Sequence, residues 1–292
     1  MAALLANLGI AVAKFVGFAL TRSSSMLAEA VHSCADSGNQ GLLLLGGRQA
    51  ARKADDDHPF GYGRARFFWA FVVALVLFAL GSLFALYEGY QKLRHPHEID
   101  SAYIAIGILV VAIGLELFSF RTAIVESNHV RGDQGWVSFI RHSKSPELPV
   151  VLLEDAGALF GLVLALIGVS VTLATGDPMW DALGTLSIGV LLGVIAVVLA
   201  VEMRSLLIGE GASPRDAELI RSAIEAGPDV RRLIHVKTLY LGPEELLVAA
   251  KIEIDATSTS AMAATINATE ARVRAVVPTA RVIYLEPDVY TL

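Results

Sequence analysis

Residues 28–40 read AEAVHSCADSGNQ, a polar stretch inside a segment that is otherwise apolar enough to span a membrane. Side chains three, four and seven residues apart lie on one face of an α-helix. This face carries Glu29, His32, Asp36 and Asn39, with Gln40 beside it. A charge at the centre of a bilayer costs about 2.5–3.5 kcal/mol, so charged residues there indicate a function. An imidazole and a carboxylate one helical turn apart also make a ligand pair for a divalent metal ion.

The composition of the chain is that of an integral membrane protein. Of its 292 residues 54% are hydrophobic and 18% are charged, whereas about a quarter of a globular protein is charged. The net charge of −6 is not typical of a protein that binds nucleic acid. The single cysteine, Cys34, excludes an intramolecular disulfide. The first segment has no basic start and contains Lys14, so we expect a retained helix rather than a signal peptide.

Six apolar segments are long enough to cross a bilayer. They comprise residues 2–20, 26–47, 67–87, 102–120, 150–174 and 182–208. The connection over residues 126–149 is polar and has no periodicity, which predicts a loop.

Basic residues in the connections predict the orientation, because cytoplasmic loops carry an excess of lysine and arginine. The second and fourth connections and the end of the sixth segment hold Arg48, Arg52, Lys53, Arg64, Arg66, Arg121, Arg131, Arg141, Lys144 and Arg204. The odd-numbered connections hold only Arg22, Lys92 and Arg94. We therefore expect both termini in the cytoplasm, and we expect the membrane to be a bacterial plasma membrane.

The character of the chain changes after the sixth segment, where a separate cytoplasmic domain is expected. Residues 214–226 have the pattern of an amphipathic helix, with Ser213 as its N-cap. Strands are predicted at residues 234–241, 246–254 and 281–286, and a second helix at residues 258–276. The order αββαβ suits a small α+β layer, in which two helices cover one face of a three-stranded sheet.

A second acidic pair, Glu154 and Asp155, interrupts the fifth apolar segment. Adjacent helical residues point about 100° apart, so we expect only one of the two to face a shared site. Together with His32 and Asp36, the pair gives a set of one imidazole and two carboxylates, which can bind Zn²⁺. These groups lose protons when they bind a metal, so metal binding and proton release are coupled, as a transporter requires.

Two stretches, SSSMLAEAVHSCADSGNQ (23–40) and DDDHPFGYGRARF (55–67), resemble the cation diffusion facilitator family of divalent-metal exporters. The resemblance covers nearly the whole chain. It implies an α-helical membrane protein with six transmembrane helices in residues 1–208, followed by a ferredoxin-like cytoplasmic domain in residues 209–292. The pattern HSxxDxxNQ in the second segment and EDAGALFG in the fifth are similar to the branch that includes a mitochondrial zinc exporter.

The resemblance also implies a ligand set. The transport site of the family has two ligands on the second helix and two on the fifth, each pair four residues apart. His32, Asp36 and Asp155 match three of these positions, and Val151 stands at the fourth. Glu154, Asn39 or water is left to complete the shell. Zinc is favoured because it prefers four-coordinate sites of His and carboxylate, with Mn²⁺, Fe²⁺, Co²⁺ and Ni²⁺ as alternatives. No resident cofactor is expected.

Two auxiliary metal sites of some relatives are incomplete in this chain. Asp55 and His58 match one of them, but Tyr62 replaces a histidine. The competing interpretation is that this stretch is a turn that positions the third helix. His235 matches a ligand of the other site, and the last strand lacks the matching His and Asp, so we expect that site to be absent.

Three further acids have other expected roles. Glu29 serves either the access path or the helix end. Glu116 and Asp181 could each lie on the ion path, but hydrogen bonding between helices is favoured for Glu116 and helix capping for Asp181.

We therefore expect a homodimeric transporter, not an enzyme, that exports Zn²⁺ in exchange for H⁺ by alternating access. The rival hypothesis is a membrane-embedded metal sensor or scaffold that binds metal without turnover. A channel is disfavoured because a site that strips the hydration shell would trap the ion.

Overall fold

The computed structural model describes residues 2–96 and 102–290, with the side chains of its first helix from residue 9 onward. Residues 97–101, which belong to the predicted third connection, lie outside this description. The chain divides into two compact units. The first comprises residues 1–46 and 68–203, and the second comprises residues 47–67 and 204–292.

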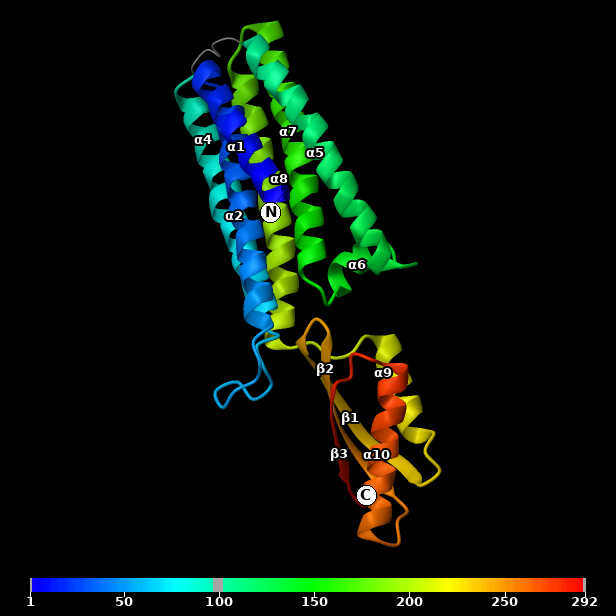
Figure 1. Ribbon diagram of the computed structural model, residues 1–292. Helices are drawn as coiled ribbons and strands as arrows, with labels where there is room; N and C mark the ends of the chain where they lie inside the picture. The colour runs from blue at the N-terminus through cyan, green and yellow to red at the C-terminus, as the bar shows by residue number, and fades with distance from the viewer. Residues whose placement is uncertain (1, 97–101, 291–292) are drawn as a thin grey trace. The chain divides into compact units, whose positions relative to one another are not determined.

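The first unit is built from helices (Figure 1). The helices that begin in it or enter it are α1 (Ala2–Thr21), α2 (Ser24–Ala50), α3 (Ala65–Val76), the π-helix η1 (Leu77–Leu83), α4 (Phe84–Arg94), α5 (Ala102–Arg131), α6 (Trp136–His142), α7 (Glu147–Thr175) and α8 (Met179–Ile208). A helix satisfies its own backbone hydrogen bonds, which is why helices suit a lipid environment.

Four helical stretches within the described ranges are long and apolar enough to cross a membrane. They are Ala65–Arg94, Ala102–Arg131, Glu147–Thr175 and Met179–Ile208. The described apolar part of α1, Gly9–Thr21, is shorter, and α2 carries the polar stripe. The chain is therefore an integral membrane protein, and its crossing the membrane six times stays a prediction.

Two predicted elements differ from the structure. The third apolar segment is not one α-helix, because the π-helical turn η1 separates α3 from α4. The predicted loop at residues 126–149 is wrong, since α5 continues to Arg131 and α6 forms within it. Neither glycine nor proline interrupts α5 after residue 120, and the helix ends just before Gly132, whose φ of 57° is left-handed.

Small residues let the long helices approach closely. A Cβ added at Gly157 on α7 would lie 2.9 Å from Cδ1 of Ile195 on α8. A Cβ at Gly189 on α8 would lie 2.7 Å from Cγ of Leu86 on α4. Ser82 of η1 donates a hydrogen bond to the carbonyl oxygen of Gly189 at 2.8 Å. Close packing on α8 thus fixes both the π-helix and α7.

Asp181 ties the start of α8 to the start of α2. Its carboxylate accepts hydrogen bonds from Oγ of Ser23 at 2.9 Å, from the backbone N–H of Ser24 at 3.0 Å and from Oγ of Ser24 at 2.9 Å. Asp181 is fully buried. The residue therefore caps a helix, as expected, but the helix it caps is α2 rather than its own.

Replacing Asp181 with alanine should destabilise the first unit. The change leaves Oγ of Ser23 and the backbone N–H of Ser24 without their acceptor, and each unpaired buried donor costs roughly 1–3 kcal/mol. We expect a clear fall in the thermal midpoint of the full chain in detergent. Asp177→Ala in the neighbouring turn is the control, because the Asp177 carboxylate accepts a solvent-exposed hydrogen bond from the backbone N–H of Met179. Equal midpoints for the two variants would contradict this interpretation.

The second unit contains a three-stranded sheet covered by two helices (Figure 1). Its elements are α9 (Pro214–Glu225), β1 (Val230–Gly242), β2 (Glu245–Ile254), α10 (Thr259–Val276) and β3 (Val282–Pro287). Strand β2 lies in the centre, antiparallel to β1 and parallel to β3. Alternate residues of β2 are buried, among them Leu246, Val248, Ala250 and Ile252. The predicted order αββαβ is confirmed, and Ser213 caps α9 by accepting from the N–H of Asp216.

Candidate metal site

Helix α2 carries the predicted polar stripe into the first unit. Glu29, His32 and Asn39 are fully buried, and the side chain of Asp36 is 15% exposed. Nδ1 of His32 lies 3.5 Å from Oδ1 of Asp36. Within the part of the chain that is described, neither ring nitrogen of His32 has a hydrogen-bond partner, nor has Oδ1 of Asp36. These atoms are therefore available as ligands.

Helix α7 brings its acidic pair to the same region. Glu154 and Asp155 are both buried, and each is held by a neighbouring helix. Nδ2 of Asn39 on α2 donates to Oε1 of Glu154 at 2.6 Å. Oγ of Ser119 on α5 donates to Oδ2 of Asp155 at 2.9 Å. The two carboxylates are thus oriented by hydrogen bonds from different helices.

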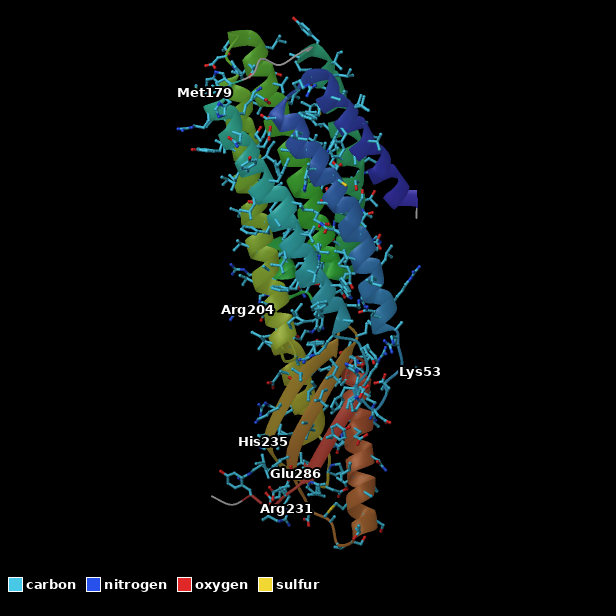
Figure 2. The ribbon with its side chains drawn as sticks, turned by 90° about the vertical axis from the view of Figure 1, so that its left-hand side faces the viewer. Lys53, Met179, Arg204, Arg231, His235 and Glu286 are labelled. Atoms are coloured by element: carbon cyan, nitrogen blue, oxygen red, sulfur yellow. The ribbon has the colours of Figure 1, made fainter. Side chains whose placement is uncertain are left out.

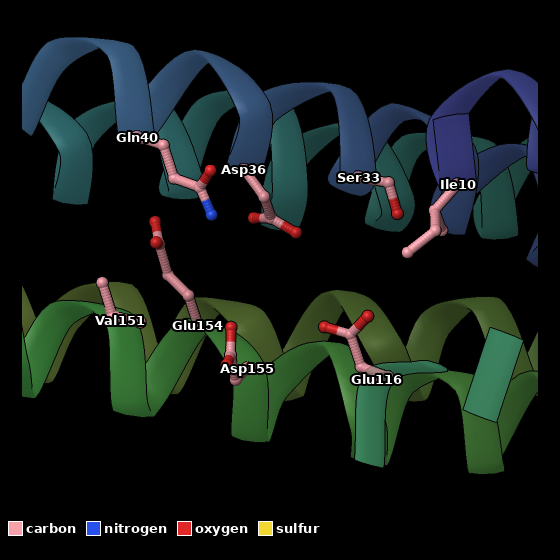
Figure 3. A pocket seen from close by; sticks show the side chains of 8 residues that line it. All are labelled: Ile10, Ser33, Asp36, Gln40, Glu116, Val151, Glu154 and Asp155. Carbon is pink, nitrogen blue, oxygen red and sulfur yellow. The ribbon is translucent and has the colours of Figure 1, made fainter. Parts of the chain in front are cut away.

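A small pocket lies where these helices meet, and Figure 3 shows its polar side chains facing one another. Its lining comprises Ile10, Ser33, Asp36, Gln40, Glu116, Val151, Glu154 and Asp155. It has room for about one water molecule or an ion of similar size. Both Glu154 and Asp155 line it, so the expectation that only one of them faces the shared site is wrong.

The pocket differs from the predicted ligand set at three positions. His32 and Asn39 lie beside it rather than in its wall. A Cβ added at Gly81 of η1 would lie 3.8 Å from Nδ1 of His32, so the imidazole is next to the π-helix. Glu116 on α5 lines the pocket, although its sequence context favours hydrogen bonding between helices over a place on the ion path. The signal for that second role is an isolated acid in an apolar segment.

Across residues 2–96 and 102–290, no group of three or more His, Cys, Asp or Glu side chains is close enough together to hold a metal ion. The structure brings Asp36, Glu154 and Asp155 to one pocket without closing a cage around it. His32 is joined to this group through its contact with Asp36.

In the loop that resembles an auxiliary metal site, the side chain of Tyr62 binds Asp55. Oη of Tyr62 donates to Oδ2 of Asp55 at 2.7 Å, and the rings of His58 and Tyr62 are 4.3 Å apart. The Tyr62 hydrogen bond holds the pKa of Asp55 below its usual value, helped by the backbone N–H of His58. Tyr62 therefore binds the carboxylate that a metal would share with His58, which supports the turn interpretation.

A lysine lies among the carboxylates near His235 in the second unit, where Figure 2 labels His235 and Glu286. Lys251 is the register partner of His235. Its Nζ lies 3.1 Å from Oε1 of Glu286 and 2.8 Å from Oδ2 of Asp288. The hydrogen bond from Lys251 holds the pKa of Asp288 below its usual value. The Lys251 ammonium group is thus the cation that pairs with the carboxylates of Glu286 and Asp288.

The Lys251 cluster should make a small contribution to stability that depends on pH. Because the pKa of Asp288 is lowered in the folded state, the contribution is complete above the unfolded value of about 3.9. It is lost as the pH falls through the lowered folded pKa. Lys251→Met should therefore lower the thermal midpoint at neutral pH and make no difference in strong acid. Lys237→Met, at an exposed position of β1, is the control. A thermal midpoint of Lys251→Met that stays below that of the parent in acid would contradict the assignment.

Comparisons with known proteins agree with this picture. A family model for the cation efflux transmembrane domain matches residues 1–208. The mitochondrial proton-coupled zinc antiporter SLC30A9 of Xenopus laevis is 33% identical over 245 residues, which are 83% of this chain and 44% of that protein. The human protein of the same name is 31% identical over 83% of this chain and 43% of its own length. Metal tolerance protein C4 of Arabidopsis thaliana is 30% identical over 83% of this chain and 53% of its own length. The chain thus spans about half the length of these relatives.

Proposed function

The chain belongs to the cation efflux family, that is, the cation diffusion facilitators, and from this premise we propose that it exports a divalent metal ion. One observation carries the proposal: Asp36 on α2 and Asp155 on α7 line the same ion-sized pocket. Zinc is the first candidate because the similar proteins are named as zinc antiporters. Mn²⁺, Fe²⁺, Co²⁺ and Ni²⁺ are the alternatives. The transport function, rather than an enzymatic one, is that of the family.

The proposed ligands are His32, Asp36, Asp155 and Glu154. The first three match the family pattern, and Glu154 replaces the ligand that Val151 cannot supply. Asn39 binds one oxygen of Glu154 and leaves the other for the metal, so its role is to position that carboxylate. The imidazole of His32 has both nitrogens without a partner, which supports a small rotation toward an ion held by Asp36.

Exchange for protons follows from the chemistry of these groups. Carboxylates and imidazole bind either a proton or a metal, so the two occupants exclude each other. A metal entering the pocket releases protons, and protons arriving from the other side release the metal. Alternating access then requires that the pocket opens to one side of the membrane at a time.

The proposed topology has six transmembrane helices in residues 1–208, with both termini and the domain of residues 209–292 in the cytoplasm. The basic residues of the even-numbered connections support this orientation. We propose a bacterial plasma membrane as the site. The end of the bundle at the α1–α2 turn is then the outer end.

Zinc uptake into proteoliposomes that contain the full chain tests the function. Uptake should rise when the proton gradient is directed against zinc movement, and each protein should carry many ions. Uptake that ignores the proton gradient would contradict antiport. Stoichiometric binding without flux would favour the rival, a membrane-embedded metal sensor or scaffold.

A homodimer is also proposed, with the second unit as its dimerisation module. Removing the chain after Arg204 should shift the protein in detergent toward monomers, as measured by light scattering. An unchanged dimer would place the interface in the helical unit instead.

A further inference from the structure

Lys14 is a fully buried lysine in the middle of α1. Its Nζ donates to Oε2 of Glu29 at 3.1 Å and to Oγ of Ser33 at 2.6 Å, both on α2. The side chains of the ion pair are 1% and 0% exposed. The pair therefore links α1 and α2 inside the bundle.

Such a pair is not needed to hold the helices together. Taking two charges out of water costs free energy that their attraction only partly returns, so apolar replacements are often equally stable or more stable. Charged residues inside a membrane segment are for this reason functional hypotheses by default. The ligand set proposed above does not use Lys14 or Glu29.

The position of the pair suggests its role. Ser33, which accepts from Lys14, also lines the ion-sized pocket. Glu29 precedes Asp36 by seven residues, about two helical turns closer to the start of α2. Any ion that leaves the pocket toward the α1–α2 turn must pass this level of the bundle.

At this level side chains of α2 and α5 fill the space against glycines of α1 and α7. A Cβ added at Gly161 would clash with Oε1 of Glu29, so the carboxylate reaches from α2 to the backbone of α7. Beyond it, a Cβ at Gly17 on α1 would lie 3.3 Å from Sδ of Met26 and 2.8 Å from Cδ1 of Ile108. Met26 itself is fully buried. Lys14 and Glu29 are the last charged groups before this apolar contact.

We propose that the Lys14–Glu29 ion pair is the outer gate of the transport path, and that the Lys14 ammonium is a tethered cation which a departing metal ion displaces from Glu29. Oε1 of Glu29 is buried without a hydrogen-bond partner, so it offers an oxygen ligand to an ion on its way out. This inference rests on the proposed function and deepens it: Glu29 becomes a relay ligand between the pocket and the outer side.

The test measures whether water-soluble reagents reach the level of the gate. Ile188 on α8 is fully buried, and its Cγ2 lies 3.8 Å from the Cβ position at Gly161. We would introduce Ile188→Cys into the full chain, in a Cys34→Ala background. A membrane-impermeant thiol reagent is then added to the outer side of right-side-out bacterial vesicles. The rate of labelling reports how often the gate is open.

The decisive variant combines Lys14→Met with Glu29→Gln, which removes both charges while keeping the side-chain sizes. It should label about ten-fold faster than the parent, a shift in the open population worth about 1.4 kcal/mol. Ser82→Ala, which removes a different buried bond to α8, is the control for general loosening and should label at the parent's rate. Equal labelling of the double variant and the parent would overturn the gate.

A second measurement needs no variant of the pair. In the parent, saturating zinc should accelerate labelling, because the ion displaces Lys14 as it leaves. Zinc flux is measured in the same vesicles. If the parent carries no zinc, the proposed function fails, and the labelling of the double variant still decides whether the pair closes the path. If the parent carries zinc and zinc leaves labelling unchanged, the gate is overturned and the transport function stands.

Discussion

Replacing Asp36 with alanine is expected to abolish zinc transport and to weaken zinc binding by at least ~100-fold. Loss of a partner that only orients a ligand already costs about 10–100-fold in metal affinity, and Asp36 is a proposed ligand itself. Its carboxylate lines the pocket, and its Oδ1 has no other partner within the described ranges. Removing it also takes away the carboxylate that lies 3.5 Å from Nδ1 of His32. Calorimetric titration with zinc and proteoliposome uptake measure the two effects.

Asp36→Asn keeps the shape of the side chain and separates charge from packing. It should fail to transport zinc while its thermal midpoint stays close to that of the parent. Asp57→Ala is the matched control, because Asp57 is an exposed acid in the loop after α2 and should leave uptake unchanged. Transport by Asp36→Asn at the rate of the parent would remove this residue from the site.

Replacing Asp155 with asparagine should abolish zinc uptake as well. Asp155 is the one proposed ligand on α7 that matches the family position, and it faces the pocket opposite α2 (Figure 3). The neutral amide is a much weaker ligand than the carboxylate, so zinc uptake should fall below detection. Asp177→Asn, in the turn that follows α7, is the control because Asp177 is half-buried and lies outside the pocket lining.

Ser119→Ala adds an intermediate result for the same site. Ser119 orients Asp155 through its 2.9 Å hydrogen bond and is not itself a ligand. Zinc affinity should therefore fall by about 10–100-fold, the usual effect of losing an orienting partner. If Ser119→Ala impaired zinc binding and uptake as severely as Asp155→Asn, the assignment would be contradicted. It would also be contradicted if neither change had an effect.

Local pattern was enough to predict much of the fold. The alternation of residues 246–254 and the N-cap at Ser213 are local signals, and the structure has the corresponding strand β2 and helix α9. The polar stripe of α2 is predictable from sequence because one helical face carries several polar groups that are unfavourable in a membrane. Glu154 and Asp155 stand out in an apolar segment for the same reason.

The remaining features depend on contacts between helices, which one segment does not encode. In a membrane helix nearly every face is apolar, so periodicity does not tell which neighbour Glu116 or Lys14 meets. The π-helix depends on Ser82 and on packing against α8. The placement of His32 beside η1, rather than in the pocket wall, likewise follows from tertiary packing. Asp181 was recognised as a cap, but only the fold shows that it caps α2.

The central claim is that the transported metal binds between α2 and α7, and anomalous diffraction from crystals soaked in zinc tests it most directly. We expect an anomalous peak at the zinc edge in the pocket, within bonding distance of Asp36 and Asp155, with His32 turned toward it. A peak confined to the Asp55 loop or to the sheet around His235, with none between α2 and α7, would contradict it.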